Sequence, residues 1–245
     1  MSAKPIVYAS GGKLGDLIHQ LSIINEMYLI TERKGVLYLK SDHFITNYLI
    51  TYNDNSSLIR CQPYIEKFAI WNGEPYEIDL SIWRSSPLLY KRSLQTIFSS
   101  IYHIDWARSQ WLTVGEKKPK LASKVLFCCN ECPGRFPNKI NFIKLFAKYD
   151  IDNILFITQT ISEYTAFSSK TGIQMQLYTP SSIEDFVISI NSCSLFIGNL
   201  SSPLTYAYAL HKSNITLLNT DCWDQNLHFT GLNFMKEFEF IKHYD

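Results

Sequence analysis

The sequence predicts an α/β protein made of two units, each with a mainly parallel sheet flanked by helices. Apolar runs of strand length alternate with helical patterns along most of the 245 residues, which is typical of βα units with right-handed crossovers. The alternation stops at the polar segment Gly115–Lys120, which contains glycine and proline, and then starts again. We therefore expect two Rossmann-like domains, 1–118 and 119–245, that face each other across a cleft.

The first array opens with a strand, a turn rich in glycine and a helix. Residues 6–9 form a short apolar run, and the helix that follows the turn has apolar residues at the spacing of one helix face. The remaining elements expected in this half are strands over 36–39, 68–71 and 78–83, and helices over 44–52 and 87–102.

The second array repeats the pattern with more regular spacing. Strands are expected over 124–129, 154–158, 174–178, 195–197 and 215–218, and helices over 138–148, 162–170, 182–191 and from 201 to 210. Phe234, Phe238 and Ile241 lie at helical spacing, so the sequence predicts a C-terminal helix over 233–243.

Two strand-to-helix turns, after the first strand of the chain and after the strand at 195–197, are candidate binding sites. Gly198 and Asn199 can turn the chain, Ser201 and Ser202 are favourable N-caps, and Pro203 suits the first helical position. Such a strand–turn–helix aims N–H groups and the positive end of a helix dipole at one point, as phosphate sites do. An ordinary α/β connection that binds nothing is the alternative.

Composition limits the partners and the compartment. A net charge of +1 gives no overall attraction to nucleic acid. No apolar stretch of about 18 residues suggests a transmembrane segment and no signal peptide is recognisable, so a cytoplasmic protein is expected. Cys129 and Cys132 have the spacing of a zinc or redox pair, but no second pair accompanies them, which favours buried thiols in a reducing compartment.

Three segments, 12–24, 134–143 and 182–203, resemble motifs of glycosyltransferase family 9, the ADP-heptose–lipopolysaccharide heptosyltransferase group, in the family's order. The resemblance implies a GT-B fold, with an N-terminal acceptor-binding domain and a C-terminal nucleotide-sugar-binding domain. It also implies inverting transfer of a sugar to a glycan or other hydroxyl acceptor without a metal or another cofactor. Leu200 and Thr205 stand where the family has aspartate and histidine, which speaks against an ADP-heptose donor and leaves the sugar open.

Asp16 is the candidate catalytic base, because the family places a catalytic aspartate at this turn. An acid that only complements the helix dipole is the alternative. His19, one helical turn further on, is a second catalytic candidate that would orient the acceptor, or else a packed side chain. Gly12, Lys13 and Gly15 are the candidate acceptor-binding residues.

The candidate donor site lies in the second half. Ser201 and Ser202 would hold the diphosphate, with Asn199 beside them and Arg135 and Lys139 as cations. The nucleoside would lie along strand ends, one of which is Thr158. Glu163 would hydrogen-bond ribose hydroxyls, and Tyr178 would pack on the base or simply pack in the protein. No cluster of carboxylates lies near the predicted phosphate-binding turn to suggest a metal site. A catalytically idle nucleotide-sugar-binding homologue and a sugar-nucleotide epimerase or hydrolase remain as alternatives.

Overall fold

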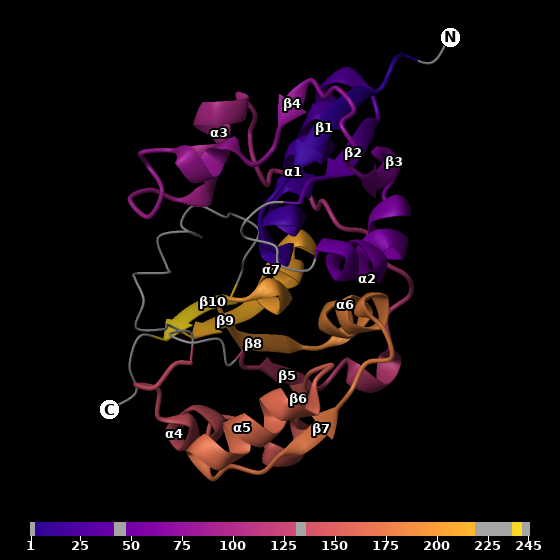
Figure 1. The fold of residues 1–245 in the computed structure, drawn as a ribbon. Coiled ribbons are helices and arrows are strands. Elements are labelled where there is room, and N and C mark those ends of the chain that lie inside the picture. Colours follow the sequence, from indigo (N-terminus) through magenta and orange to yellow (C-terminus); the bar gives the residue numbers. More distant parts are fainter. Residues whose placement is uncertain (1–2, 42–47, 131–135, 219–236, 242–245) are drawn as a thin grey trace. The chain divides into compact units, whose positions relative to one another are not determined.

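The computed structural model describes residues 3–41, 48–130, 136–218 and 237–241 (Figure 1). The chain divides into two compact units between Thr113 and Val114, whereas the sequence suggested a division after 118. The strand β10 (Glu237–Ile241) belongs to the second unit. Each unit has its own parallel sheet, as expected for a two-domain α/β protein.

The first unit contains a four-stranded sheet in the order β3-β2-β1-β4, with all neighbours parallel. Because β1 lies between β2 and β4, the segments that leave β1 and β4 emerge side by side at the carboxyl edge of this sheet. The elements are β1 (Ile6–Ser10), α1 (Leu14–Thr31), β2 (Gly35–Leu39), α2 (Tyr48–Arg60), β3 (Ile65–Ile70), β4 (Ile78–Asp79), the 3-10 helix η1 (Ile82–Ser85) and α3 (Leu94–Tyr102).

Helix α1 is the central helix of the first unit. Every residue from Leu17 to Glu26 is buried, so the helix is covered on all sides over this stretch. The loop after α3 contributes to this cover, because the indole N–H groups of Trp106 and Trp111 donate to the carbonyls of His19 and Ile18, at 3.3 and 2.8 Å. These hydrogen bonds attach the loop to the N-terminal half of α1.

The second unit contains a six-stranded parallel sheet in the order β10-β9-β8-β5-β6-β7. Counted from β5, this is the order 3-2-1-4-5-6 of the doubly wound dinucleotide-binding fold. The elements are η2 (Pro119–Leu121), β5 (Val125–Cys128), α4 (Phe142–Phe146), η3 (Ile151–Asn153), β6 (Ile154–Ile157), α5 (Ile161–Thr171), β7 (Gln176–Tyr178), α6 (Ile183–Ser192), β8 (Leu195–Asn199), α7 (Ser202–Ala209), β9 (Asn214–Leu218) and β10.

The helices of the second unit cover both faces of its sheet: α4 and α5 lie on one side, and α6 and α7 on the other (Figure 1). Under α4 and α5, the core is aromatic. The ring of Phe127 in β5 lies 5.0 Å from those of Phe146 and Phe167 and 5.4 Å from that of Phe156, measured between centroids. The neighbouring strands β5 and β8 are separated in sequence by two βα units, so the chain winds away from them in opposite directions.

Several element predictions need correction. The prediction of a C-terminal helix is wrong for the described residues of this segment, since 237–241 form the strand β10 beside β9. The sequence Glu-Phe-Glu-Phe alternates with period two, and this strand pattern prevails over the helical spacing of Phe238 and Ile241. Phe234 lies outside the described residues.

The strand expected over 78–83 ends at Asp79, because the Asp79 carboxylate accepts hydrogen bonds from the N–H and Oγ of Ser81 and closes a turn. The helix expected from 87 begins only at Leu94, where the Ser93 hydroxyl caps it by accepting from the N–H of Thr96 at 3.2 Å. The helix expected over 138–148 is reduced to α4.

Candidate active site

In the first unit, the turn between β1 and α1 is held by polar side chains from its own helix. Gln20 accepts a hydrogen bond from the Ser10 hydroxyl at 2.6 Å and donates to the carbonyl of Gly11 at 3.0 Å. Both Ser10 and Gln20 are fully buried. The glycine turn is therefore fixed on the helix, and so is the first turn of α1, which carries Asp16.

Asp16 lies three residues after Lys13, the N-cap of α1, and its Oδ2 accepts the N–H of Lys13 at 2.6 Å. The same oxygen accepts a hydrogen bond from Arg84 of η1, in an ion pair whose side chains are 14% (Asp16) and 21% (Arg84) exposed. Both partners stabilise the ionised carboxylate. A group that must take a proton has to be ionised beforehand, so this arrangement suits a base at the carboxyl edge of the sheet.

Gly12 allows this close approach. Its φ of +103° is one that L side chains rarely adopt, and a Cβ added there would lie 2.7 Å from Asp16 Oδ2 and 3.2 Å from Arg84 Nε. Gly12 is therefore required by the geometry of the ion pair, whatever it contributes to the acceptor. The side chain of Lys13 is exposed and Gly15 lies in the first turn of α1, so both flank Asp16.

A second ion pair lies where β2 and β4 end. Lys40 Nζ is 2.7 Å from Asp79 Oδ2, and the other Asp79 oxygen accepts the two hydrogen bonds from Ser81. Burial by itself would raise the pKa of Asp79, but the hydrogen bonds from Lys40 and Ser81 outweigh it and hold this pKa below its usual value. Asp79 is thus occupied in closing the turn that leads to η1 and Arg84.

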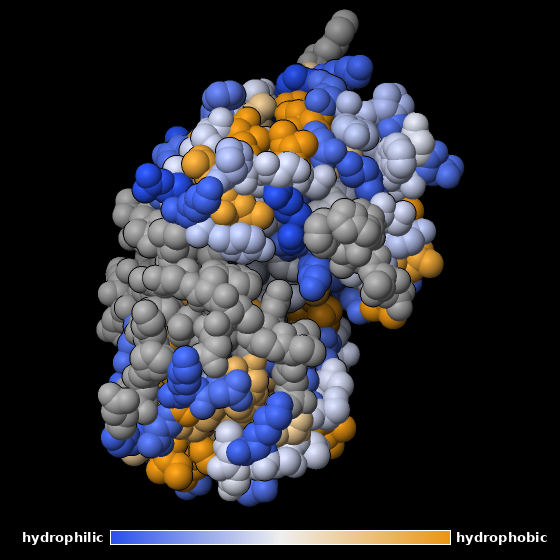
Figure 2. All heavy atoms as spheres, turned by 60° about the vertical axis from the view of Figure 1, so that its left-hand side comes forward, coloured by the Kyte–Doolittle hydropathy of each residue, from blue (hydrophilic) through white to orange (hydrophobic). Residues whose placement is uncertain are grey.

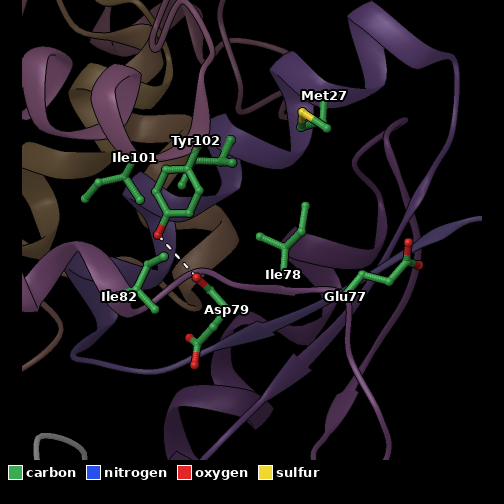
Figure 3. A pocket seen from close by; sticks show the side chains of 8 residues that line it. Met27, Glu77, Ile78, Asp79, Ile82, Ile101 and Tyr102 are labelled. Carbon is green, nitrogen blue, oxygen red and sulfur yellow. Dashed lines mark hydrogen bonds between the residues drawn. The ribbon is translucent and has the colours of Figure 1, made fainter.

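A cavity of about 260 Å³ opens beside β4 (Figure 3). Tyr102 points its hydroxyl toward the carbonyl oxygen of Asp79, at 3.4 Å, and the other walls are mainly apolar. Glu77 also lines the cavity, but its Oε1 accepts the N–H of Val7 at 3.2 Å. The acids of this cavity therefore serve the sheet, and we do not place the chemistry there. The lining residues are Ile23, Met27, Glu77, Ile78, Asp79, Ile82, Ile101 and Tyr102.

His19 occupies a packed position. His19 is only 6% exposed, and the centroid of its imidazole ring lies 5.8 Å from the ring centroid of Trp106. Asp16 and His19 share a helix, but the structure brings His19 to the aromatic core and Asp16 to Arg84. This position favours the packing alternative for His19.

In the second unit, the switch point of the sheet is bridged by one side chain. The Oδ1 of Asn199, the last residue of β8, accepts the N–H of Asn130 at 2.9 Å, and its Nδ2 donates to the carbonyl of Asn130 at 3.0 Å. Asn130 follows β5, and Asn199 is fully buried. The amide of Asn199 thus acts like a strand backbone and ties together the ends of β5 and β8, where doubly wound sheets bind their ligands.

The start of α7 lies directly after this bridge. Ser201 is its N-cap and is nearly buried, and its hydroxyl donates to the carbonyl of Asn199 at 3.1 Å. Pro203 is in the first helical turn and lacks an N–H, so the helix start offers fewer donors than a typical phosphate site. Ser202 is more exposed than Ser201 and is the better placed hydroxyl.

Thr158 and Glu163 lie together after β6. The hydroxyl of the buried Thr158 donates to Oε2 of Glu163, which is in the first turn of α5. The sequence predicted both as donor-binding residues, with Glu163 as the ribose contact, and the hydrogen bond means that Thr158 orients Glu163. Lys139 is exposed, and Arg135 lies outside the described residues.

Tyr178, the last residue of β7, lies in a polar cluster. Its hydroxyl accepts a hydrogen bond from Lys118 Nζ at 2.8 Å, and Lys118 also forms an ion pair with Asp185 and contacts Ser189. Burial raises the pKa of the Tyr178 phenol, but the hydrogen bonds from Lys118 and Ser189 and the charge of Lys118 outweigh it and lower this pKa. Tyr178 is therefore bound to protein groups, and packing on a base would use only its ring.

Arg84, Asn130 and Lys118 are the residues that sequence reasoning missed. Arg84 and Asp16 are 68 positions apart in the sequence, so they do not form a local motif. Asp79 followed by Ser81 was the usable indication, because this pair predicts a turn before Arg84. Within the described ranges, no group of three or more His, Cys, Asp or Glu side chains is arranged to hold a metal ion.

Large exposed apolar side chains are scattered over the chain. On the face shown in Figure 2, hydrophobic residues form separate patches divided by hydrophilic ones. Scattered apolar residues of this kind are normal on a protein surface. None of the helices in the described part of the chain has the length and apolar character needed to cross a lipid bilayer.

Comparisons by sequence found no relative: no protein-family model matches the chain, and no curated protein matches it significantly. Solved structures are similar. The glycosyl transferase family 9 protein from Veillonella parvula aligns with a TM-score of 0.61 at 10% identity, covering 98% of this chain and 87% of that one. For E. coli heptosyltransferase WaaC with ADP-2-deoxy-2-fluoro heptose, the TM-score is 0.58 at 9% identity, covering 98% and 93%.

A further similar structure is the iron-containing dodecameric glycosyltransferase TibC from enterotoxigenic E. coli, with a TM-score of 0.55 at 14% identity, covering 89% of this chain and 59% of that one. Identities this low concern the fold. They confirm the fold class predicted from the sequence, two Rossmann-like α/β units of the GT-B type, and with it the structural resemblance to glycosyltransferase family 9.

Proposed function

We propose that this GT-B chain is a glycosyltransferase that moves a sugar from a nucleotide diphosphate sugar to a hydroxyl group of a glycan or other acceptor. The observation that carries the proposal is the switch point of the second unit, where Asn199 ties β8 to β5 directly before the start of α7. In open α/β sheets, nucleotides bind outside the carboxyl ends of the strands at such a point. The structural neighbour WaaC, solved with ADP-2-deoxy-2-fluoro heptose, supports the same donor class.

In this proposal the second unit, which we assign to the donor, stabilises the leaving diphosphate. Charge builds on the diphosphate oxygen as its bond to the sugar breaks. Ser202 and the start of α7 would offer donors to it, with Lys139 and Arg135 as the cations. Glu163, oriented by Thr158, would accept hydrogen bonds from ribose hydroxyls. These protein groups would make a metal unnecessary.

The first unit would bind the acceptor and carry the base. The ionised Asp16 accepts the proton of the acceptor hydroxyl while the oxygen attacks the anomeric carbon. A single displacement of this kind inverts the configuration at that carbon. The sugar, whether hexosyl, pentosyl or heptosyl, is left to experiment, since Leu200 and Thr205 differ from the heptosyltransferase motif.

Thermal unfolding with UDP, GDP, ADP and CMP and their sugars tests the proposal. A ligand at 100 times its dissociation constant adds about 2.7 kcal/mol of stability, which is easily measured. The stabilising nucleotide sugar is then incubated with acceptor glycans, and transfer is followed by mass spectrometry. Stabilisation without transfer would favour an idle homologue, conversion of the sugar nucleotide without an acceptor would favour an epimerase or hydrolase, and no stabilisation by any nucleotide would contradict the donor site.

A further inference from the structure

The two oxygens of the Asp16 carboxylate have different surroundings. Oδ2 accepts the N–H of Lys13 at 2.6 Å and the hydrogen bond from Arg84. Within the described ranges, no hydrogen-bond donor contacts Oδ1. One oxygen of the candidate base is therefore fixed by protein groups, and the other has no such partner among the described residues.

Arg84 is held in place by the core of the first unit. Its guanidinium carbon lies 4.9 Å from the ring centroid of Trp83. Trp83 is buried and packs edge-on against Phe98 of α3, at 5.2 Å between centroids. The cation thus rests on an aromatic side chain that cannot move without disturbing the core, which makes it a rigid partner for Asp16.

We propose that Arg84 is a positioning residue that holds Oδ2 of Asp16 and so makes Oδ1 the oxygen that receives the acceptor's proton. The proposal rests on the proposed sugar transfer. In that step the acceptor oxygen bonds to the anomeric carbon, and the bond from this carbon to the diphosphate oxygen breaks. The electron pair of that bond leaves with the diphosphate, and the acceptor's proton passes to Oδ1.

The charged groups around Asp16 define what a test has to separate. Lys13 and His19 lie on its own turn and helix, Arg84 comes from η1, and the Lys40–Asp79 pair lies where β2 and β4 end. Lys40 and Asp79 neutralise each other. Arg84 is therefore the cation whose removal should change the titration of Asp16 most.

Arg84→Gln and Arg84→Lys test the role, with Arg33→Gln as a matched control. Arg33 is an arginine of the same unit whose guanidinium lies 3.7 Å from Glu77 and also donates to the carbonyl of Lys4. For Arg84→Gln we expect kcat to fall about tenfold or more with an unchanged KM for the donor, and the acidic limb of the kcat–pH profile to move up by about one pH unit or more. Arg84→Lys keeps the charge, so the limb should return toward its original position. Arg33→Gln should change neither.

A titration of the Asp16 carboxyl carbon by NMR supplies a readout that needs no turnover. Its midpoint should move to higher pH in Arg84→Gln and stay in place in Arg33→Gln, provided that thermal unfolding shows each variant to be folded. An unmoved midpoint, or a variant that raises only the KM for the acceptor, would overturn the role of Arg84. A wild-type protein that binds no nucleotide sugar would instead overturn the proposed function, because the titration does not depend on it.

Discussion

Asp16 performs the task that the sequence offered as the alternative to catalysis, since it accepts the N–H of Lys13 at the start of α1. This task and a catalytic one do not exclude each other. The helix start and Arg84 use the same oxygen, Oδ2, so neither of them occupies the second oxygen. A residue whose position suits both a helix start and a reaction is difficult to assign from sequence, because either task alone explains its position.

Asp16→Asn separates the two tasks. The amide oxygen can still accept from Lys13, but the side chain cannot take a proton, so we expect turnover to fall by about 10²-fold or more with nearly unchanged donor affinity. Steady-state kinetics and calorimetric titration of the donor measure the two quantities. Glu66→Gln, at an exposed position of β3, is the control. Normal turnover in Asp16→Asn would return Asp16 to a purely structural role.

Gly12→Ala should damage the same site by a different route. The added Cβ would lie 2.7 Å from Asp16 Oδ2, so the ion pair with Arg84 has to shift, and turnover should fall by at least tenfold. Gly73→Ala is a matched control, because Gly73 has a similar φ of +94° but no atom within 4 Å of the added Cβ. Both variants place an L side chain at a positive φ, and this backbone strain costs about 1–2 kcal/mol of stability. If both lost activity equally, strain rather than the contact with Asp16 would be the cause.

Sequence reasoning singled out the segment with Gly12 and Asp16 because a glycine turn before an amphipathic helix is a local pattern, and the family resemblance proposed Asp16 as the base. It did not find Arg84 or the amide bridge of Asn199, because their partners come from other βα units and depend on which strands become neighbours. It proposed Asn199 and Thr158 as ligand contacts, and the structure adds protein partners for both.

Among the elements, the junction of β5 and β8 depends most on a single side chain. Asn199→Ala would remove this partner from the N–H and carbonyl of the half-buried Asn130, at a cost toward the lower end of the about 1–3 kcal/mol of an unsatisfied buried group. Urea unfolding measures the loss. Asn138→Ala, at an exposed position of the same unit, should cost little. An equal effect of the two substitutions would contradict the role of the bridge.

Asn199→Asp adds a pH dependence to the same experiment. Burial would raise the pKa of the introduced carboxyl in the folded protein above its unfolded value of about 3.9. The protonated form can donate to the carbonyl of Asn130, whereas the ionised form is repelled by it. Relative to the wild type, the variant should therefore be most stable at low pH. It should lose stability as the pH rises through the pKa of the introduced carboxyl in the folded protein.

At the end of β7, the polar cluster around Tyr178 should be visible in an alkaline titration. Its lowered pKa means that Tyr178 ionises before Tyr8 and Tyr102, whose pKa values burial raises. The difference in stability between the wild type and Tyr178→Phe should therefore grow as the pH rises from the folded pKa of Tyr178 toward about 10, the unfolded value. Phenolate absorbance follows the ionisation.

Lys118→Met should delay this first ionisation, because Lys118 donates to the phenol and supplies the nearest charge. The matched control is Lys148→Met, which removes a lysine that pairs with Glu239 elsewhere in the unit. A first ionisation that Lys118→Met leaves in place would contradict the assignment to Tyr178.

Elements with strong periodicity were predicted well, and those decided by capping or pairing were not. The pattern of α6 gave its length almost to the residue, because Ser182 caps it and its apolar face is regular. The start of α3 was missed because apolar residues at Leu88 and Leu89 continue its pattern before the cap at Ser93. The C-terminal strand was taken for a helix because pairing with β9 is not visible in a local window.

At the scale of the whole molecule, the sequence predicted two parallel α/β arrays, and strand order came only from the structure. Alternating βα units favour parallel sheets, but the order depends on long-range pairing, such as that between β5 and β8. This order puts the start of α7 at the switch point. The candidate donor site is therefore a property of topology rather than of any single motif.

Nucleotide binding should not depend on a divalent metal. Magnesium and manganese prefer oxygen ligands, typically carboxylates together with phosphate, and the donor site that we propose uses serine hydroxyls, N–H groups and cations. Calorimetric titration of the nucleotide with and without EDTA should give the same affinity. Complete loss of binding in EDTA would mean that the diphosphate is held in a different way.

Arg135→Ala tests where the diphosphate lies. Removal of a charge-assisted contact should weaken binding of the nucleoside diphosphate much more than binding of the nucleoside. Calorimetry with both ligands gives the two affinities. Equal losses for both would place Arg135 outside the phosphate site.

The tryptophan side chains, including the two whose indole groups donate to α1, are distributed unevenly along the chain. Trp71, Trp83, Trp106 and Trp111 all belong to the first unit, and the remaining tryptophan of the chain, Trp223, lies outside the described residues. With Trp223 replaced by phenylalanine, tryptophan fluorescence would come from the first unit alone. Its quenching and spectral shift would then report how that unit opens or binds an acceptor, while the second unit stays dark at the same wavelengths.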